Sequence, residues 1–328
     1  MHEELRAALA GLLDGLPPKQ AAQAVERLIA NYRGTTPTDA PVLRDRADVA
    51  AYAAYRMPAT FEAVRAALTA FAVRVPDWSP ATHVDIGGGT GAATWAAAAT
   101  WEGHRSTVLD WAQPALDLGR ELAAGILPDT SWQRQIIGEG LTVPAGTDLV
   151  TVSYVLGELR PEARRAVVDA AAAAQAVVLI EPGTPDGYLR IREARDQLIA
   201  AGLRVVAPCP HSDTCPIVPL VGGVGAPPAV AGGDWCHFSA RVSRSSLHRQ
   251  VKGGSLPYED EKFSYVAATT LDAAPAPSRI VRKPQLRKGQ VLLDLCTAED
   301  GLQRTTVTKR HGADYRAARD ANWGDDWA

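Results

Sequence analysis

Four cysteines are the residues of this chain best suited to hold a metal. Five residues separate Cys209 from Cys215, 20 separate Cys215 from Cys236, and 59 separate Cys236 from Cys296. Four thiolates complete the coordination of a zinc ion or of a four-iron four-sulfur cluster. Structural zinc favours paired Cys-x-x-Cys knuckles, which the sequence lacks. Single distant cysteines, two of them followed by proline, favour the cluster and leave zinc as the alternative metal. A simpler alternative, which needs no metal, is that each cysteine is a separately buried thiol.

A glycine-rich turn offers a second site, this one for a nucleotide. The run Val-Asp-Ile-Gly-Gly-Gly-Thr-Gly places Gly87, Gly89 and Gly91 where a predicted strand turns into a helix. Glycines at such a turn let a ligand approach the backbone, and the helix start offers free N–H groups. About 20 residues later Asp110 ends the next predicted strand, where a carboxylate can accept hydrogen bonds from ribose hydroxyls. Asp85, just before the turn, suits a ligand with an amino and a sulfonium group; a tight loop without a ligand is the alternative.

The glycine spacing distinguishes between two classes of cofactor that bind at such turns, dinucleotides and S-adenosylmethionine. It reads Gly-x-Gly-x-Gly, unlike the Gly-x-Gly-x-x-Gly pattern that cradles a dinucleotide pyrophosphate. Together with the acid that follows, residues 82 to 183 resemble the S-adenosylmethionine-dependent methyltransferase superfamily. The resemblance implies that S-adenosylmethionine binds at Asp85, Gly87, Gly89, Gly91, Asp110 and Tyr154.

The loop that would carry the chemistry in that superfamily is Ser153 to Leu159. It lacks the Asn-Pro-Pro-Tyr or Asp-Pro-Pro-Tyr motif, whose acceptors orient an amine for methylation. Glu158 is the candidate catalytic residue, as a general base, and a cap at a helix start is an equal alternative. The sequence therefore leaves open whether methyl transfer occurs.

Positive charge gathers near the end of a chain whose formal net charge is only −3. Between Arg279 and Arg319 there are ten Lys and Arg side chains against four Asp and Glu side chains. Clustered cations neutralise phosphates, and aromatic rings stack on unpaired bases. An ordinary solvated face is the alternative. The residues predicted to contact RNA are Arg282, Lys283, Arg287, Lys288, Lys309, Arg310, Tyr315, Arg316 and Arg319.

Short segments distributed over most of residues 47 to 325 match a single known family. They are Tyr52–Thr60, the glycine turn, Tyr154–Leu159, Cys209–His211, Cys215–Pro216, Trp235–Phe238, Lys309–Tyr315, Ala318–Arg319 and Trp323–Asp325. In these segments the chain resembles the methyltransferase-like proteins of bacteria and mitochondria that associate with the small ribosomal subunit during its assembly. The resemblance implies that the four cysteines hold a four-iron four-sulfur cluster and that the partners are rRNA and proteins of the small subunit.

The elements that must position these residues follow from hydrophobic periodicity. The first 75 residues predict helices, including one opened by two prolines and one over residues 47–71 that Pro58 breaks into two. From Thr82 onward, short apolar runs alternate with helical segments, which predicts parallel strands joined by crossover helices. The uncharged stretch 219–233 predicts a loop, and short β-like runs follow it.

The predicted fold class is α/β: a Rossmann-like class I methyltransferase domain with N-terminal helices and a small β-rich C-terminal part. The predicted divisions are a helical segment 1–75, a Rossmann-like S-adenosylmethionine-binding domain 76–205, a cysteine-rich metal-binding region with the last strands 206–278, and a basic β-rich RNA-binding tail 279–328.

Composition excludes several other classes. The 328 residues, 46% apolar and 22% charged, are typical of a folded protein with a substantial core and exclude wholesale disorder. No run of 18 uncharged apolar residues occurs, so no membrane span is expected. Glu3 and Glu4 stand where a leader peptide would be basic. We therefore expect a cytoplasmic protein whose thiols stay reduced. The resemblance adds the expectation of a bacterial protein, and the oligomeric state stays open, with a monomer favoured.

The leading interpretation is a small ribosomal subunit assembly factor that binds S-adenosylmethionine, an iron-sulfur cluster and rRNA without catalysing methyl transfer. The first alternative is an active S-adenosylmethionine-dependent rRNA methyltransferase. A further alternative is a zinc-containing methyltransferase of small molecules, for which the basic tail would be irrelevant.

Overall fold

The computed structural model describes residues 2–12, 46–217, 235–245 and 256–327, with five isolated positions between 19 and 26. Most of the helix predicted after the two prolines lies outside the described residues, and so does the predicted loop 219–233. All four cysteines are described.

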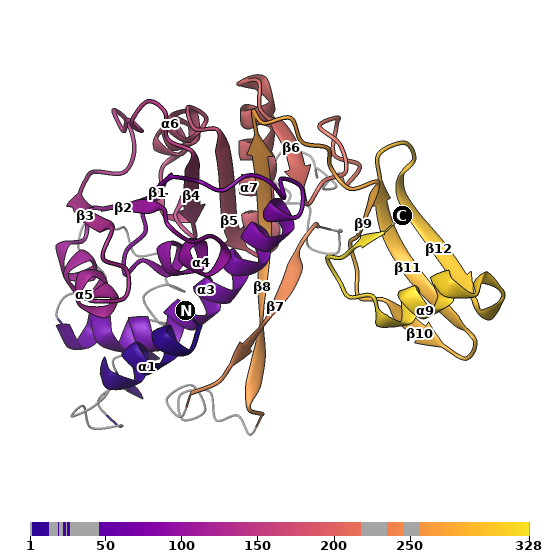
Figure 1. Cartoon of the computed structure of the whole chain (residues 1–328), viewed down its shortest axis with the longest axis horizontal. Helices are drawn as coiled ribbons and strands as arrows, with labels where there is room; N and C mark the ends of the chain where they lie inside the picture. The colour runs from indigo at the N-terminus through magenta and orange to yellow at the C-terminus, as the bar shows by residue number, and fades with distance from the viewer. Residues whose placement is uncertain are drawn as a thin grey trace, which may run out of the picture.

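The larger of two sheets forms the centre of the molecule (Figure 1). Its strands are β1 Thr82–Ile86, β2 Arg105–Asp110, β3 Thr130–Arg134, β4 Leu149–Ser153, β5 Ala176–Pro182, β6 Arg204–Ala207, β7 Phe238–Ser243 and β8 Tyr258–Thr269. Their order is β3-β2-β1-β4-β5-β8-β6, with β7 also paired to β8. The first five strands are parallel, and β8 runs antiparallel to all three of its neighbours. The crossover pattern predicted a parallel sheet, and the structure adds this one reversed strand.

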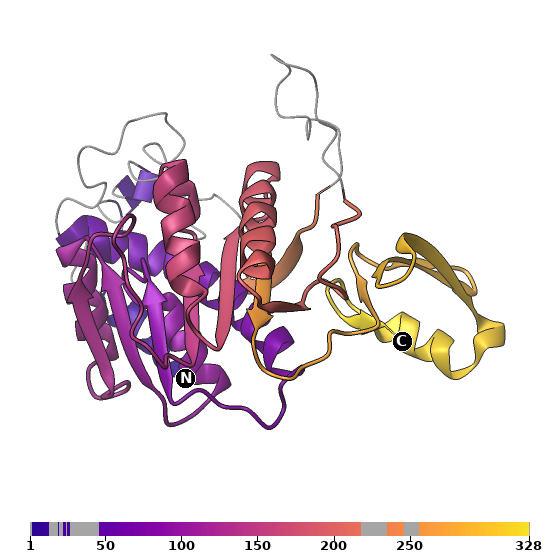
Figure 2. The same ribbon diagram turned by 90° about the horizontal axis from the view of Figure 1, so that it is seen from above.

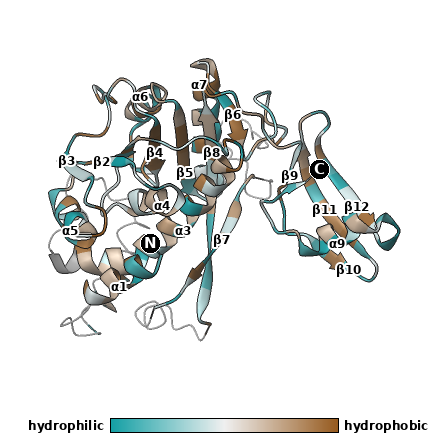
Figure 3. Ribbon diagram, in the orientation of Figure 1, coloured by the Kyte–Doolittle hydropathy of each residue, from teal (hydrophilic) through white to brown (hydrophobic). Residues whose placement is uncertain are grey.

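Helices cover both faces of the larger sheet. They are α1 His2–Leu12, α3 Arg46–Ala72, α4 Ala92–Thr100, α5 Gln113–Ala123, the 3-10 turn η1 Leu156–Glu158, α6 Pro161–Ala171 and α7 Pro185–Ala200. Buried residues of α1, α3, α4 and α5 share one apolar cluster, and those of α6 and α7 share another. The central strands β4 and β5 are accordingly largely hydrophobic (Figure 3) and almost entirely buried, as expected for strands covered on both faces. Among the described residues no helix is long and apolar enough to cross a membrane.

Helix α3 corrects one prediction, because it continues through Pro58 without dividing. A proline inside a helix removes one hydrogen bond and costs about 3 kcal/mol. Residues on both sides of it, including Ala53, Met57 and Phe61, are 0–2% exposed and pack against α4 and the sheet. Burial on both sides of the proline therefore offsets its cost, which periodicity alone did not reveal.

The C-terminal part forms a second, smaller antiparallel sheet (Figures 1 and 2). Its elements are β9 Ser278–Ile280, β10 Gln285–Arg287, β11 Gln290–Thr297, β12 Gly301–Thr308, the 3-10 turn η2 Lys309–His311, α9 Ala313–Asp320 and β13 Asp326–Trp327. The strand order is β10-β11-β9-β13, with β12 on the other side of β11. Ala318 of α9 packs on one face, over Leu293 and Val307. The predicted α/β class with a β-rich C-terminal part is confirmed, whereas α9 and the short strands β3, β9, β10 and β13 were not predicted.

Direct contacts join the two sheets. Arg74, just after α3, forms an ion pair of 2.7 Å with Asp326 of β13. The Trp323 ring packs edge-on against His237, with centroids 4.8 Å apart, and lies 4.4 Å from the Lys262 ammonium of β8. The smaller sheet is therefore docked beside β7 and β8, at the end of the larger sheet where the cysteines lie.

Candidate functional site

The glycine turn lies at the carboxyl ends of β1 and β4, where the strand order reverses direction. Ligands of open α/β sheets bind at such a switch point. Gly87 and Gly91 have φ values of 67° and 85°, which disfavour other residues. A Cβ atom at Gly87 would lie 2.4 Å from Val155, and one at Gly91 would lie 2.6 Å from Trp132. The turn therefore requires glycine for both its conformation and its packing.

Asp110 is fixed at the same edge of the sheet. Its carboxylate accepts the backbone N–H of Gly89 at 2.9 Å and that of Ala112 at 2.8 Å. Burial raises the pKa of Asp110, and these two hydrogen bonds oppose the rise. A Cβ atom at Gly89 would meet only this carboxylate, at 3.8 Å, so space remains beside the turn. The arrangement fits the predicted ribose-binding acid.

Asp85 lies beneath the turn, fully buried. Its two carboxylate oxygens accept hydroxyl hydrogens from Thr94 at 3.1 Å and from Thr151 at 2.9 Å. The Thr151 hydroxyl donates its hydrogen to Asp85, so its oxygen accepts the hydrogen bond from Nε2 of His83 at 2.8 Å. With its hydrogen on Nε2, the neutral His83 ring accepts a hydrogen bond from the Ser106 hydroxyl at Nδ1. Burial lowers the pKa of His83 to about 3, consistent with this neutral ring. In the described structure Asp85 therefore supports the turn from below.

Asp85 makes stability depend on pH. Burial raises its pKa from 3.8 to about 7, against the hydroxyl hydrogen bonds that lower it. A carboxyl whose pKa is higher in the folded than in the unfolded state destabilises the fold as pH rises between the two values. The difference between the two pKa values corresponds to about 4 kcal/mol of folding stability. This stability is lost as pH rises from about 4 to about 7, and the loss stays constant above pH 7.

We expect Asp85→Asn to remove this pH dependence. Urea unfolding of cofactor-free protein at pH 5 and pH 8 should show wild type losing about 3 kcal/mol more than the variant between the two conditions. Equal losses in the two proteins would contradict the assignment to Asp85.

Tyr154 is held by two residues that the sequence did not single out. It has a φ of 61°, rare for a residue other than glycine. Its hydroxyl donates to Glu261 of β8 at 3.0 Å, and Arg56 of α3 donates to both oxygens of Glu261, at 2.9 and 3.2 Å. The Arg56 guanidinium also lies over the Tyr154 ring, 5.4 Å from its centroid. Arg56 belongs to the Tyr52–Thr60 segment that carried the family resemblance, which was the available signal.

Glu158 ends the 3-10 turn η1 beyond β4. The residue keeps exposed surface, but desolvation of its carboxylate by neighbouring atoms, followed by the nearby carboxylates of Asp110 and Glu181, raises its pKa to about 7. The turn is anchored beside it, because Glu181 accepts the Leu156 N–H at 3.0 Å and pairs with Arg190 at 2.6 Å. Glu158 could thus exchange a proton near neutral pH, as a general base must.

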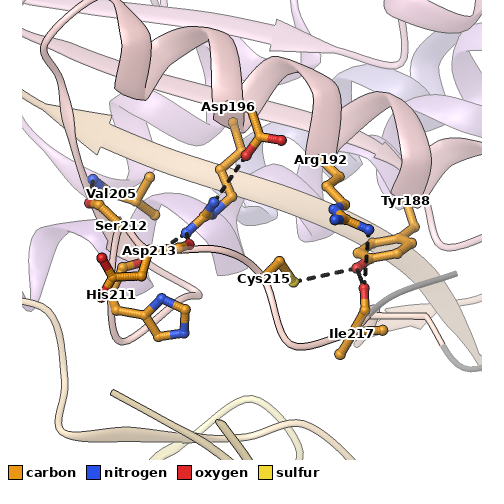
Figure 4. Close-up of polar contacts among 10 residues, drawn as sticks. Tyr188, Arg192, Asp196, Val205, His211, Ser212, Asp213, Cys215 and Ile217 are labelled. Carbon is orange, nitrogen blue, oxygen red and sulfur yellow. Dashed lines mark hydrogen bonds and ion pairs between the residues drawn. The ribbon is translucent and has the colours of Figure 1, made fainter. Parts of the chain in front are cut away.

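The four cysteines line one cavity, although they come from separate segments. Cys209 and Cys215 follow β6, Cys236 precedes β7, and Cys296 lies in β11 of the smaller sheet. All four are free thiols. The hydroxyl of Tyr188 donates to the Ile217 carbonyl at 2.7 Å and lies 3.5 Å from the Cys215 sulfur (Figure 4). The cavity therefore contains thiols from both sheets.

The thiols act on one another electrostatically. Burial raises the pKa of Cys209, Cys236 and Cys296, and the neighbouring thiols add to each rise. In the described part of the chain, no three His, Cys, Asp or Glu side chains already stand in a geometry that could hold a metal ion. A tetrahedral zinc ion needs sulfurs about 3.8 Å apart, since each Zn–S bond is about 2.3 Å. The cysteines are gathered around one cavity without that close convergence.

The predicted RNA-contacting residues are divided between two environments. Lys283, Arg287, Lys288, Lys309, Arg310, Arg316 and Arg319 are exposed. Tyr315 is half-buried and packs against the apolar cluster of the smaller sheet. Arg282 is half-buried and donates to the Trp235 carbonyl at 3.1 Å.

Four of the exposed cations lie at one end of the smaller sheet. Arg287 ends β10, Lys288 lies in the turn between β10 and β11, and Lys309 and Arg310 follow β12. The Lys309 N–H donates to the Gly289 carbonyl at 3.1 Å, which brings the two segments together. We call Arg287, Lys288, Lys309 and Arg310 the basic corner. Arg304, elsewhere on this sheet, is paired with Asp294 at 2.7 Å.

The strand order, the glycine turn and the carboxylate ending β2 define a Rossmann-like methyltransferase fold. The chain belongs to the family described as mitochondrial small ribosomal subunit Rsm22, whose model matches residues 46–328. That match includes the methyltransferase fold, all four cysteines and the smaller sheet.

Two relatives and one solved structure are similar to this chain. The human ribosome assembly protein METTL17, mitochondrial, is 28% identical over 299 residues, covering 84% of this chain and 61% of the human protein. The Rsm22-cox11 tandem protein 2, mitochondrial, of Schizosaccharomyces pombe is 28% identical over 183 residues, 45% of this chain and 24% of that protein. The chain thus spans less than two thirds of either relative. A putative RNA methyltransferase from Pyrococcus horikoshii is similar with a TM-score of 0.40 and 13% identity, covering 76% of this chain and 97% of that one.

Proposed function

We propose that this chain is an assembly factor of the small ribosomal subunit that binds rRNA through its smaller sheet. The family match and the human relative, named as a ribosome assembly protein, support the class of function. The observation that carries the proposal is the cavity in which cysteines of the larger sheet meet Cys296 of the smaller one. That cavity links a cofactor-binding fold to a basic module.

S-adenosylmethionine would bind at the glycine turn and Asp110. The residues fit, because two glycines there exclude side chains and Asp110 is oriented by two backbone N–H groups. Tyr154, fixed by Glu261, lies at the end of the adjacent strand β4. When bound, the cofactor supplies an activated methyl group.

A four-iron four-sulfur cluster is the group that we propose for the cysteine cavity, with zinc as the alternative. Four free, buried or half-buried thiols around one cavity form a donor set suited to either centre. The single, widely spaced cysteines, without the paired Cys-x-x-Cys knuckles of structural zinc sites, favour the cluster over zinc. When bound, the centre cross-links the two sheets.

The second candidate function, an active rRNA methyltransferase, is favoured by Glu158, whose pKa is raised to about 7 near the carboxylate of Asp110.

A single experiment separates the two functions. The chain is incubated with assembling small subunits and S-adenosylmethionine carrying a labelled methyl group. We expect it to cosediment with the subunits while leaving the RNA unlabelled. Stoichiometric label in RNA would establish the enzyme instead, and failure to cosediment would overturn the assembly function.

Asp110→Asn tests the cofactor site by a separate binding measurement. Loss of a charged acceptor for ribose hydroxyls should weaken S-adenosylmethionine binding about tenfold, measured by calorimetry. Asp117→Asn makes the same charge change on the exposed face of α5 and should bind as wild type. Equal affinities in the two variants would contradict the assignment of Asp110.

A further inference from the structure

Two buried arginines line the cysteine cavity, one from a helix that covers the larger sheet and one from a strand of the smaller sheet. Arg195 belongs to α7 and Arg279 to β9, and each is 3% exposed. Among the described residues, Nε of Arg195 and one terminal nitrogen of Arg279 are buried without a hydrogen-bond partner. Both guanidinium groups act electrostatically on Cys209 and Cys296. Buried cations with unused N–H groups beside four thiols point to an anionic occupant.

Other N–H groups of these arginines hold the loop that carries Cys209. Arg195 donates to the carbonyls of His211 at 3.0 Å and Asp213 at 2.6 Å. Arg279 donates from Nε to the Pro208 carbonyl at 3.0 Å. The charges are thus fixed on both sides of Cys209, at the junction of the two sheets.

The charges of the two buried arginines and their ion-pair partners sum to about two positive. The carboxylate paired with Arg195, Asp196, is 62% exposed, so solvent screens it. Asp326 is shared by Arg279 and Arg74, and this trio carries one net positive charge. Four thiolates around a zinc ion or around an oxidised four-iron four-sulfur core carry two net negative charges. The occupied cavity would be close to neutral.

We propose that Arg195 and Arg279 are charge-compensating residues that make this cavity selective for a dianionic tetrathiolate centre. Because Arg279 belongs to the smaller sheet, compensation is complete only when that sheet is docked, which couples loading of the centre to docking. The inference rests on the proposed metal site and adds to it the residues that determine its charge. Zinc and the cluster satisfy the same charge requirement.

Loading experiments on the full chain test the proposal. Wild type, Arg195→Met and Arg279→Met are reconstituted without oxygen, either with ferrous iron and sulfide or with zinc alone. Bound iron, sulfide and zinc are then measured together with visible absorbance. We expect each Met variant to need about ten times more metal for half occupancy. Arg192→Met is the matched control: Arg192 lies on α7 and lines the same cavity, but it is half-exposed and donates to Ile217.

A purely structural role for the arginines predicts a different pattern. If they only hold the loop, the Met variants lose stability equally with and without metal. If they compensate charge, the Met variants lose more stability in the loaded than in the metal-free protein, because only the loaded cavity holds the negative charge that the arginines balance. Arg195→Lys and Arg279→Lys, which keep the charge and lose the planar fork, should recover most of the occupancy.

The outcomes distinguish failure of the proposed metal site from failure of the charge compensation by the two arginines. If wild type takes up neither iron nor zinc, the metal site itself fails and the inference fails with it. If wild type loads and both Met variants load equally well, only the charge compensation is overturned. Equal destabilisation of metal-free and loaded variants, without rescue by lysine, would overturn it as well.

Discussion

Cys296→Ser is expected to remove most of the bound metal and to loosen the smaller sheet. Cys296 is the single thiol that this sheet contributes to the cavity among the described residues. Metal binding is coupled to folding, and losing one of four thiolates should weaken the centre at least about 100-fold. The contacts of Arg74 and Trp323 remain, so the sheet should open more often without separating permanently.

Limited proteolysis measures this opening. Arg279 is 3% exposed in the docked sheet, so trypsin should cleave there about ten times faster in Cys296→Ser than in loaded wild type. Leu302→Ser is the matched control, because Leu302 lies directly across from Cys296 on β12 and is 42% exposed. Equal metal content and equal cleavage in the two serine variants would exclude Cys296 as a ligand. A chelator should make wild type behave like Cys296→Ser.

The sequence predicted the parts of the molecule that depend on local pattern. The glycine turn and the strand ending at Asp110 depend on a few consecutive residues and the periodicity around them, and the structure has both. The cysteine spacing favoured a shared site, and the four thiols do line one cavity. Short strands such as β9 and β13 were missed, because two or three residues carry no periodicity of their own and are strands only through pairing.

The residues that sequence reasoning missed depend on distant partners. Arg56 and Glu261 are 205 positions apart, so neither segment alone indicates that the two residues jointly hold Tyr154. Arg279 was counted with the solvated cations of the tail, and the structure buries it beside the cysteines. Charge counted along a sequence gives no sign of burial, and this limits any RNA surface inferred from composition.

Among the residues predicted to contact RNA, the four exposed cations of the basic corner form the cluster that is easiest to test. Phosphate contacts from clustered cations dominate affinity for RNA and make it depend on salt. The triple variant Lys288→Ala, Lys309→Ala, Arg310→Ala should therefore bind small-subunit rRNA about 100-fold more weakly at low salt. The slope of log affinity against log salt should also fall by about two to three, as expected when three phosphate contacts to RNA are lost.

A matched triple variant on the larger sheet's side controls for total charge. Arg105→Ala, Arg160→Ala and Arg165→Ala also remove three exposed cations from the chain, far from the basic corner in sequence. Fluorescence anisotropy with the same rRNA should show near wild-type affinity and salt slope for this control. If both triple variants lose affinity equally, binding reflects net charge alone. Unchanged binding in the first variant would exclude the basic corner, because no phosphate contact there could have been lost.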